Sequence, residues 1–240
     1  MPNFRCTVGA HRGSSVKHME NTLAALLAAE RDPQYAFVEF DVQFTKDRQI
    51  VLFHDQTLLR TYGKFTSVDN ATYDELVDLT GGDIARYEDA ISIITKPVNV
   101  EIKSQGDDNE DQLLADTIIA DLRARGRDRH VMISSISSEV IRYINKCYPE
   151  MPTGLIFWLT ASTYIHWDLL TESLFDKVRE VQADYLMLYV ANLRNIENLL
   201  ELKPKNTNVI FWDFDDRMYL VHQGFTDRLW VRRFVRRQWW

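Results

Sequence analysis

The chain has 240 residues, of which 45% are hydrophobic and 26% are charged, and its net charge is −7 at pH 7. This length suits one large core, because a single α/β barrel takes about 250 residues. The acidic balance argues against nucleic acid as the main partner, since phosphate backbones attract basic surfaces. No apolar stretch approaches the ~20 residues that span a bilayer, and residues 1–12 lack the apolar run of a signal peptide.

Two cysteines, Cys6 and Cys147, lie in apolar segments. They are too few for the disulfide framework of a secreted domain. We therefore interpret both as reduced core residues of a cytoplasmic protein.

Apolar runs typical of strands alternate along the chain with stretches typical of helices. Strands are predicted at residues 7–10, 37–44, 50–53, 98–103, 131–134, 154–157, 185–188, 209–214 and 229–231. Helices are predicted between most of them, for example at residues 22–29, 111–123 and 138–147. Such alternation implies a parallel sheet.

One predicted strand, at 50–53, follows its predecessor too closely for a helical crossover and counts as an extra strand. Residues 56–95 form a small irregular insertion with short helices. Eight further strands predict an α/β fold, a TIM-type (β/α)8 barrel of parallel strands that makes one domain over residues 1–240. An open doubly wound sheet is the alternative.

The predicted strands at 37–44 and 98–103 each have one apolar face and one polar face, because side chains alternate along a strand. The polar faces carry Glu39, Asp41 and Gln43 on the first strand, and Asn99, Glu101 and Lys103 on the second. The outer face of a barrel packs on helices, so the polar faces point to the axis. Burying each carboxylate costs several kcal/mol unless a cation compensates it, and carboxylate oxygens suit Mg²⁺ or Ca²⁺. We predict a divalent metal site; the alternative is a polar face turned to solvent in an antiparallel sheet.

Two histidines come directly after predicted strands. His11 precedes Arg12 at the end of the first strand, and His54 precedes Asp55 at the end of the extra strand. Histidine is the usual general acid or base near neutral pH, and active sites of barrels lie at the carboxyl ends of the strands. Beside a carboxylate cluster, these residues favour metal-assisted phosphodiester cleavage.

Five short motifs occur in a fixed order over residues 8–103. They are Ala10-His11-Arg12-Gly13, Glu20-Asn21-Thr22, Glu39-Phe40-Asp41-Val42, His54-Asp55 and Glu101-Ile102-Lys103. In order and spacing this series resembles the glycerophosphodiester phosphodiesterase family. Farther along the chain, Ser134-Ser135 and Val209-Ile210-Phe211-Trp212 resemble the family more weakly.

The resemblance implies one divalent ion per active site, Mg²⁺ or Ca²⁺, held by Glu39, Asp41 and Glu101. His11 and His54 would share the duties of general base and general acid. The implied reaction is hydrolysis of a small glycerophosphodiester to glycerol 3-phosphate and an alcohol. Either water attacks the phosphorus directly, or the neighbouring glycerol hydroxyl attacks first and forms a cyclic phosphate.

The resemblance also implies supporting roles. Arg12 and Lys103 would grip the phosphate, and Trp212 would line the substrate pocket. Glu20 would either orient the phosphate-binding groups or touch the metal. From its own chemistry we interpret Asn21 as the N-cap of the helix that follows.

The C-terminal segment departs from the family, which commonly ends its last strand in a Thr-Asp-x-Pro turn. Residues 228–240 hold five arginines and three tryptophans without an acidic residue. We predict that this tail closes the barrel as its last strand and a final helical turn. Weak contact with a membrane surface, which Trp and Arg favour, and self-association are the alternatives.

Two other functions stay open on the sequence. The apolar residues of 155–170, together with the tail, would give a lysophospholipase D a lipid-accepting entrance. A barrel that binds phosphate without turnover is the second alternative, and the altered C-terminus is its only motivation.

Overall fold

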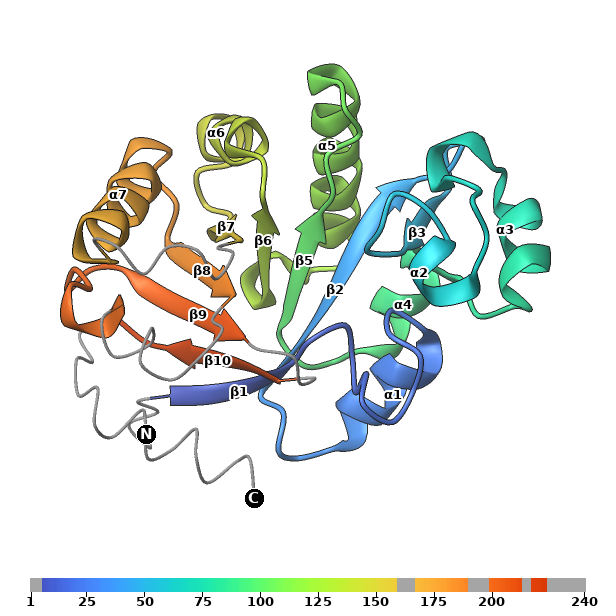
Figure 1. The fold of residues 1–240 in the computed structure, drawn as a ribbon, viewed down its shortest axis with the longest axis horizontal. Coiled ribbons are helices and arrows are strands. Elements are labelled where there is room, and N and C mark those ends of the chain that lie inside the picture. Colours follow the sequence, from blue (N-terminus) through green and yellow to red (C-terminus); the bar gives the residue numbers. More distant parts are fainter. Residues whose placement is uncertain (1–5, 159–166, 190–198, 213–216, 224–240) are drawn as a thin grey trace.

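The structure is a computed structural model that describes residues 6–158, 167–189, 199–212 and 217–223. Eight strands close a barrel, and helices lie between strands on its outside (Figure 1). The barrel strands are β1 Cys6–Ala10, β2 Phe37–Phe44, β5 Val98–Ile102, β6 Val131–Ser135, β7 Thr153–Phe157, β8 Tyr185–Tyr189, β9 Asn208–Trp212 and β10 Arg217–Val221. This confirms the predicted barrel and excludes the open doubly wound sheet.

The strands run parallel from β1 through β2 and β5 to β9, but β10 is antiparallel to both of its neighbours, β9 and β1. The prediction that all strands are parallel is wrong at this position. Only residues 213–216 separate β9 from β10, which is too short a connection for a helical crossover, so the two strands pair as a hairpin. The closing strand predicted at 229–231, and every proposal for 228–240, lie outside the described residues.

Helices α1 Leu23–Arg31, α5 Asp108–Ala124, α6 Ser138–Cys147 and α7 Trp167–Glu180 occupy the connections between barrel strands. Local capping explains where several begin, because a side-chain oxygen accepts an otherwise unpaired backbone N–H. In α1 this residue is Thr22, whose side chain accepts from Ala25 N, and in α6 it is Ser137. The expectation that Asn21 caps α1 is therefore wrong: the cap falls one residue later.

The core consists of two layers. The outward residues of β2, such as Val38 and Phe40, pack with helix residues such as Ile118 in one continuous buried cluster. A second cluster, which includes Phe37 and Met187, packs apart from the first. Because Phe37 shares its strand face with Glu39, this cluster fills the barrel interior.

The two cysteines differ in burial. Cys6 is buried on β1 as predicted, and burial raises the pKa of its thiol to about 12. Cys147 is exposed, so the prediction that it is a core residue is wrong. It ends α6, whose buried residues are Val140, Ile141 and Ile144.

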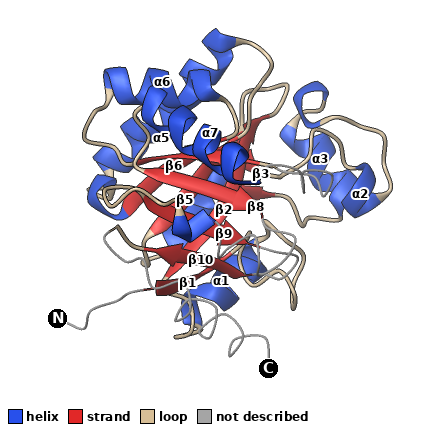
Figure 2. Cartoon of the chain, turned by 60° about the vertical axis from the view of Figure 1, so that its left-hand side comes forward, coloured by secondary structure: helices blue, strands red, loops and turns tan. Residues whose placement is uncertain are grey.

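Part of the insertion predicted at 56–95 stands beside the barrel (Figure 2). The insertion contains α2 Leu59–Tyr62, the 3-10 turn η1 Val68–Asn70, α3 Tyr73–Thr80, β4 Ala85–Arg86 and α4 Tyr87–Ile93. Outside the insertion, a second 3-10 turn, η2 Asp128–His130, precedes β6. The extra strand β3 Ile50–Leu52 pairs antiparallel with β2 and β4. A small apolar cluster around Leu58 and Leu76 packs the first part of this unit, whereas Tyr87 and Ile91 of α4 belong to the main core.

Among the described helices, none has the length and apolar character that crossing a bilayer requires. The cytoplasmic location expected from the sequence stays a prediction.

Candidate active site

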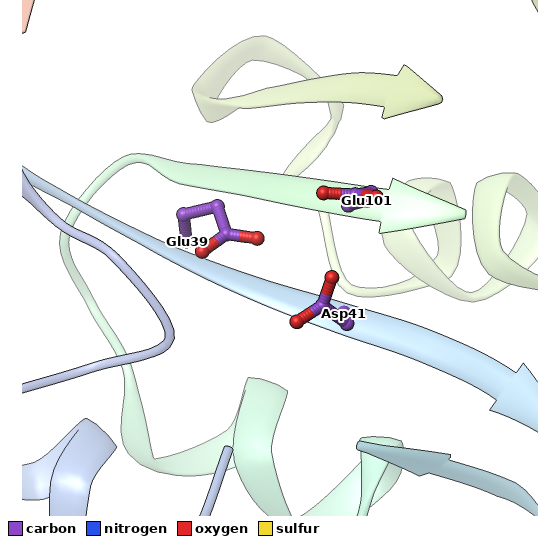
Figure 3. Close-up of side chains that lie close together, drawn as sticks. All are labelled: Glu39, Asp41 and Glu101. Carbon is purple, nitrogen blue, oxygen red and sulfur yellow. The ribbon is translucent and has the colours of Figure 1, made fainter. Parts of the chain in front are cut away.

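Three carboxylates meet inside the barrel near the carboxyl ends of two adjacent strands. Glu39 and Asp41 lie on β2, and Glu101 lies on β5 directly opposite Asp41 in the parallel register. They are almost wholly buried, with exposed fractions of 1%, 0% and 8%. One oxygen of each lies within 4.8 Å of the others, and Figure 3 shows the side chains gathered over the two strands. The prediction that these polar faces point inward is confirmed.

The chemistry of this cluster fits a divalent cation. Burial, and then repulsion from Asp41 and Glu101, raises the pKa of Glu39 well above its usual range. Glu39 Oε1 is buried, with no hydrogen-bond partner among the described residues. A buried oxygen without a partner is costly, and carboxylate oxygens are the ligands that Mg²⁺ and Ca²⁺ prefer.

Two cations lie against the same carboxylates. Lys103 Nζ is 2.8 Å from Asp41 Oδ1 and also donates to Glu101, while Arg12 Nε is 3.4 Å from Asp41 Oδ2. Burial alone would raise the pKa of Asp41, but Lys103, His54 and Arg12 together hold it well below its usual range. Asp41 is therefore ionised at neutral pH.

A tight turn after β1 places Arg12 here. Arg12 has a φ of 58° and Gly13 a φ of 77°, both in the left-handed region. A Cβ on Gly13 would come within 2.6 Å of the backbone of Ala25, so only glycine fits. In this turn the Arg12 N–H donates to Glu39 Oε2 at 2.7 Å. The Ala-His-Arg-Gly motif thus forms a tight backbone turn and also supplies proposed functional side chains.

The two histidines occupy different environments. The His11 ring lies 5.7 Å from the Trp212 ring at the end of β9. Burial, and then the charge of Arg12, lowers the pKa of His11 well below 6.5, so its imidazole is neutral near pH 7. His54 Nδ1 lies 2.6 Å from Asp55 Oδ1. An ionised carboxylate only accepts hydrogen bonds, so this contact places a proton on Nδ1 of His54.

Glu20 lies against Arg12. Its Oε1 accepts a hydrogen bond from Arg12 Nη1 at 2.9 Å, and Arg60 contacts both of its oxygens. Among the described residues the carboxylate cluster consists of Glu39, Asp41 and Glu101, without Glu20. These contacts fit the first of the two roles expected for Glu20, the orientation of Arg12, which stays a prediction.

The site roles of three residues were not predicted from the sequence. Asn21 Nδ2 donates to Asp41 Oδ2 at 2.7 Å. Gln43 Nε2 donates to the carbonyl oxygens on either side of His54, at 2.8 and 2.9 Å. Arg60 contacts Asp55 and Glu20. The position of Gln43 two residues after Asp41, on the inward face, was a usable signal, whereas Arg60 offered none.

The chain is similar to known proteins over most of its length. A family model described as the glycerophosphoryl diester phosphodiesterase family matches residues 11–232. The chain is 29% identical to lysophospholipase D GDPD3 of Homo sapiens over 188 residues, which are 68% of this chain and 56% of that protein. It is also 29% identical over 172 residues to a glycerophosphodiester phosphodiesterase of Caldanaerobacter subterraneus, covering 64% of this chain and 68% of the relative.

Solved structures share the fold. A glycerophosphodiester phosphodiesterase of Thermotoga maritima aligns with a TM-score of 0.64 at 24% identity, covering 87% of this chain and 85% of that one. A phosphodiesterase of Oleispira antarctica, solved in complex with the product sn-glycerol-3-phosphate, aligns with a TM-score of 0.65 at 19% identity, covering 93% and 88%. Since the family model spans residues 11–232, the chain belongs to the glycerophosphoryl diester phosphodiesterase family.

Proposed function

We propose that this chain hydrolyses glycerophosphodiesters to glycerol 3-phosphate and an alcohol. The observation that carries the proposal is the convergence of Glu39, Asp41 and Glu101 within 4.8 Å, with a buried Glu39 oxygen that lacks a hydrogen-bond partner among the described residues. These residues would hold one divalent cation, Mg²⁺ or Ca²⁺. When bound, the cation would polarise a phosphoryl oxygen and offset its developing charge. Family membership supports the same reaction.

The two histidines divide the proton transfers. His11, neutral because of its burial, accepts the proton of the attacking hydroxyl as the new P–O bond forms. His54 donates a proton to the oxygen of the departing alcohol as the old P–O bond breaks. The carboxylate of Asp55, 2.6 Å from Nδ1, stabilises the charged imidazole that this role requires. We therefore propose His11 as base and His54 as acid, which the burial of His11 and the contact of His54 with Asp55 support.

Arg12 and Lys103 bind the phosphate. Both lie against Asp41 of the carboxylate cluster, and Glu20 also holds Arg12. Their positive charge would attract the diester and stabilise charge that develops on the phosphoryl oxygens. Trp212, which is 5% exposed and packs beside His11, would form a wall of the substrate site.

Substrate analogues distinguish the two nucleophiles. A glycerophosphodiester without the neighbouring glycerol hydroxyl should still be cleaved if water attacks directly. It should resist cleavage if that hydroxyl attacks first. In the second case a cyclic phosphate should appear transiently in ³¹P spectra of the normal substrate.

A lysophospholipase D activity is the second candidate. Trp158, directly after β7, is 54% exposed and stacks on Tyr189 at the end of β8, with ring centroids 4.6 Å apart. The exposed Trp158 ring lies at the same end of the strands as the carboxylates and would contact an acyl chain. The human relative carries the name of this activity. Comparing choline release from glycerophosphocholine and from lysophosphatidylcholine tests which substrate is preferred.

The decisive experiment measures glycerol 3-phosphate release from a panel of glycerophosphodiesters. It includes EDTA, restoration with Mg²⁺ or Ca²⁺, and the His54→Ala variant. Release that needs the metal and is lost in the variant supports the proposal. No release from folded protein with any metal, and no choline release from lysophosphatidylcholine, would favour a barrel that binds phosphate without turnover.

A further inference from the structure

His54 differs from the other proposed site residues in how the fold supports it. Glu39, Asp41 and Glu101 lie on strands of the closed barrel, whereas His54 follows β3, which pairs with β2 and β4 outside the closed ring. Beyond the pairing of β3 with β2, its place relative to the carboxylates depends on side-chain contacts. Gln43 holds the backbone on both sides of His54, and Asp55 holds the ring.

Arg60, on α2 of the insertion, binds the carboxylate that holds this ring. Its Nε donates to Asp55 Oδ2 at 2.6 Å, while Asp55 Oδ1 faces His54. The two oxygens of Asp55 are thus each occupied, one by Arg60 and the other by His54. A carboxylate held at both oxygens cannot rotate freely, so the imidazole ring has a defined orientation.

The other side of the same guanidinium reaches Glu20, in the connection between β1 and α1. Arg60 Nη2 donates to Glu20 Oε1 at 2.5 Å, and Nη1 donates to Glu20 Oε2 at 3.2 Å. Glu20 Oε1 in turn accepts from Arg12 at 2.9 Å. A planar guanidinium can hold two carboxylates in a fixed relation because its donors form a rigid fork.

A continuous chain of contacts therefore runs from His54 through Asp55, Arg60 and Glu20 to Arg12. We propose that Arg60 is a positioning residue, which holds the His54 ring and the Arg12 guanidinium in fixed positions relative to each other without touching the substrate. The assignment of roles to His54 and Arg12 rests on the proposed function. The contacts themselves join residues 40 positions apart in the sequence.

Burial and charge separate this bridge from ordinary surface ion pairs, which contribute little. The Arg60 side chain is 50% exposed, but Asp55 and Glu20 are only 23% and 20% exposed. Without Arg60, both carboxylates would lose a shared cation at the mouth of the barrel. Asp55 would be free to rotate away from His54, and Glu20 would bind Arg12 from a less defined position.

The backbone under Arg60 does not depend on its side chain. Leu58 is fully buried in the cluster of the insertion, its N–H donates to Thr66 O at 3.0 Å, and the N–H of Tyr62 donates to Leu58 O at 2.8 Å. Substitution of Arg60 should therefore leave the insertion folded. This makes Arg60→Gln an informative variant.

Arg142 provides a matched control. It also bridges two carboxylates from different elements, Glu139 and Glu180, and its side chain is 39% exposed. It lies on α6, outside the proposed site. Arg142→Gln thus removes the same kind of contact and leaves the side-chain contacts that link His54 to Arg12 unchanged.

The kinetic test compares Arg60→Gln, Arg60→Lys and Arg142→Gln under saturating metal. We expect Arg60→Gln to lower kcat/KM by about 10- to 100-fold, as for other residues that orient site ligands, with Lys restoring part of the loss and Arg142→Gln causing none. In an Asp55→Asn background Arg60→Gln should cost less, because the two substitutions break one linkage. A loss no larger than in Arg142→Gln overturns the proposal.

A spectroscopic test works without turnover. In protein labelled with ¹⁵N-histidine, the Nδ1–H proton of His54 should resonate at low field because it is hydrogen-bonded to Asp55. Loss of this resonance in His54→Ala assigns it. Arg60→Gln should shift or broaden this resonance, and Arg142→Gln should not. An unchanged resonance in Arg60→Gln refutes the positioning role. A shifted resonance in a protein without phosphodiesterase activity would support that role and refute the proposed function alone.

Discussion

Asn21 and Asp41 form a two-point contact at the mouth of the barrel. Asn21 Nδ2 donates to Asp41 Oδ2 at 2.7 Å, and the backbone N–H of Asp41 donates to Asn21 Oδ1 at 3.1 Å. Both residues are buried. One amide therefore fixes the carboxylate of a proposed metal ligand and pairs with the strand that carries it.

Removing this amide should weaken metal binding. Asn21 has a φ of 58°, a left-handed conformation that glycine adopts readily. Asn21→Gly therefore removes the side-chain hydrogen bonds without straining the backbone. We expect metal affinity to fall by about 10- to 100-fold, measured by calorimetric titration with Mg²⁺ or Ca²⁺. Unchanged affinity in the folded variant would contradict this role. Thr22→Ala, which removes the cap of α1, is the control: it should lower stability by about 1 kcal/mol with little effect on affinity.

Glu39→Gln should stabilise the metal-free protein and abolish its metal response. The folded-state pKa of Glu39 is raised, so the folded protein is penalised as the pH rises above the unfolded value of about 4.3. At neutral pH in EDTA we expect a gain of at most about 4 kcal/mol, because keeping this carboxyl protonated costs about 1.4 kcal/mol for each pH unit above its unfolded pKa. Wild-type Tm should rise when Mg²⁺ is added, and that of Glu39→Gln should not. A variant less stable than wild type in EDTA would show that Glu39 is already compensated.

Gly13→Ala should disrupt the turn that carries Arg12. Its Cβ would meet the Ala25 backbone carbon at 2.6 Å in addition to the left-handed φ of 77°. Gly63→Ala is the matched control, because Gly63 has a φ of 67° with open space around the added atom. We expect the control to lose about 1 kcal/mol and Gly13→Ala to lose clearly more, measured by urea unfolding. Equal losses would mean that the turn adjusts to the contact.

Asp55→Asn should reduce stability in a pH-dependent way. Burial alone would raise the pKa of Asp55, but hydrogen bonds from His54 and Arg60 lower it to about 2. A depressed folded pKa contributes stability above the unfolded value of about 3.9, and that contribution is lost as the pH falls from 4 towards 2. The variant should therefore be less stable than wild type at pH 6, and the difference should shrink as the pH is lowered below 4. Urea unfolding at several pH values measures it, and a constant difference would contradict the cause.

Local patterns in the sequence determined the inner face of the barrel. Glu39 and Asp41 alternate with apolar residues because the side-chain period of a strand is two, and that period is independent of the rest of the fold. The same holds for the helix at 138–147, which begins and ends where predicted because its N-cap and its apolar spacing are local features. The motifs around His11 and His54 were placed at strand ends for the same reason.

Tertiary structure alone decided the remaining features. Asn21 looked like a helix cap because its chemistry suits one, but a left-handed backbone at that position turns its amide to Asp41. The antiparallel β10 closes the barrel because its pairing partners, β1 and β9, come from opposite ends of the chain. Arg60 reaches Glu20 across 40 residues. Side-chain periodicity is encoded over a few neighbouring residues, whereas these contacts depend on which distant segments the closed barrel brings together.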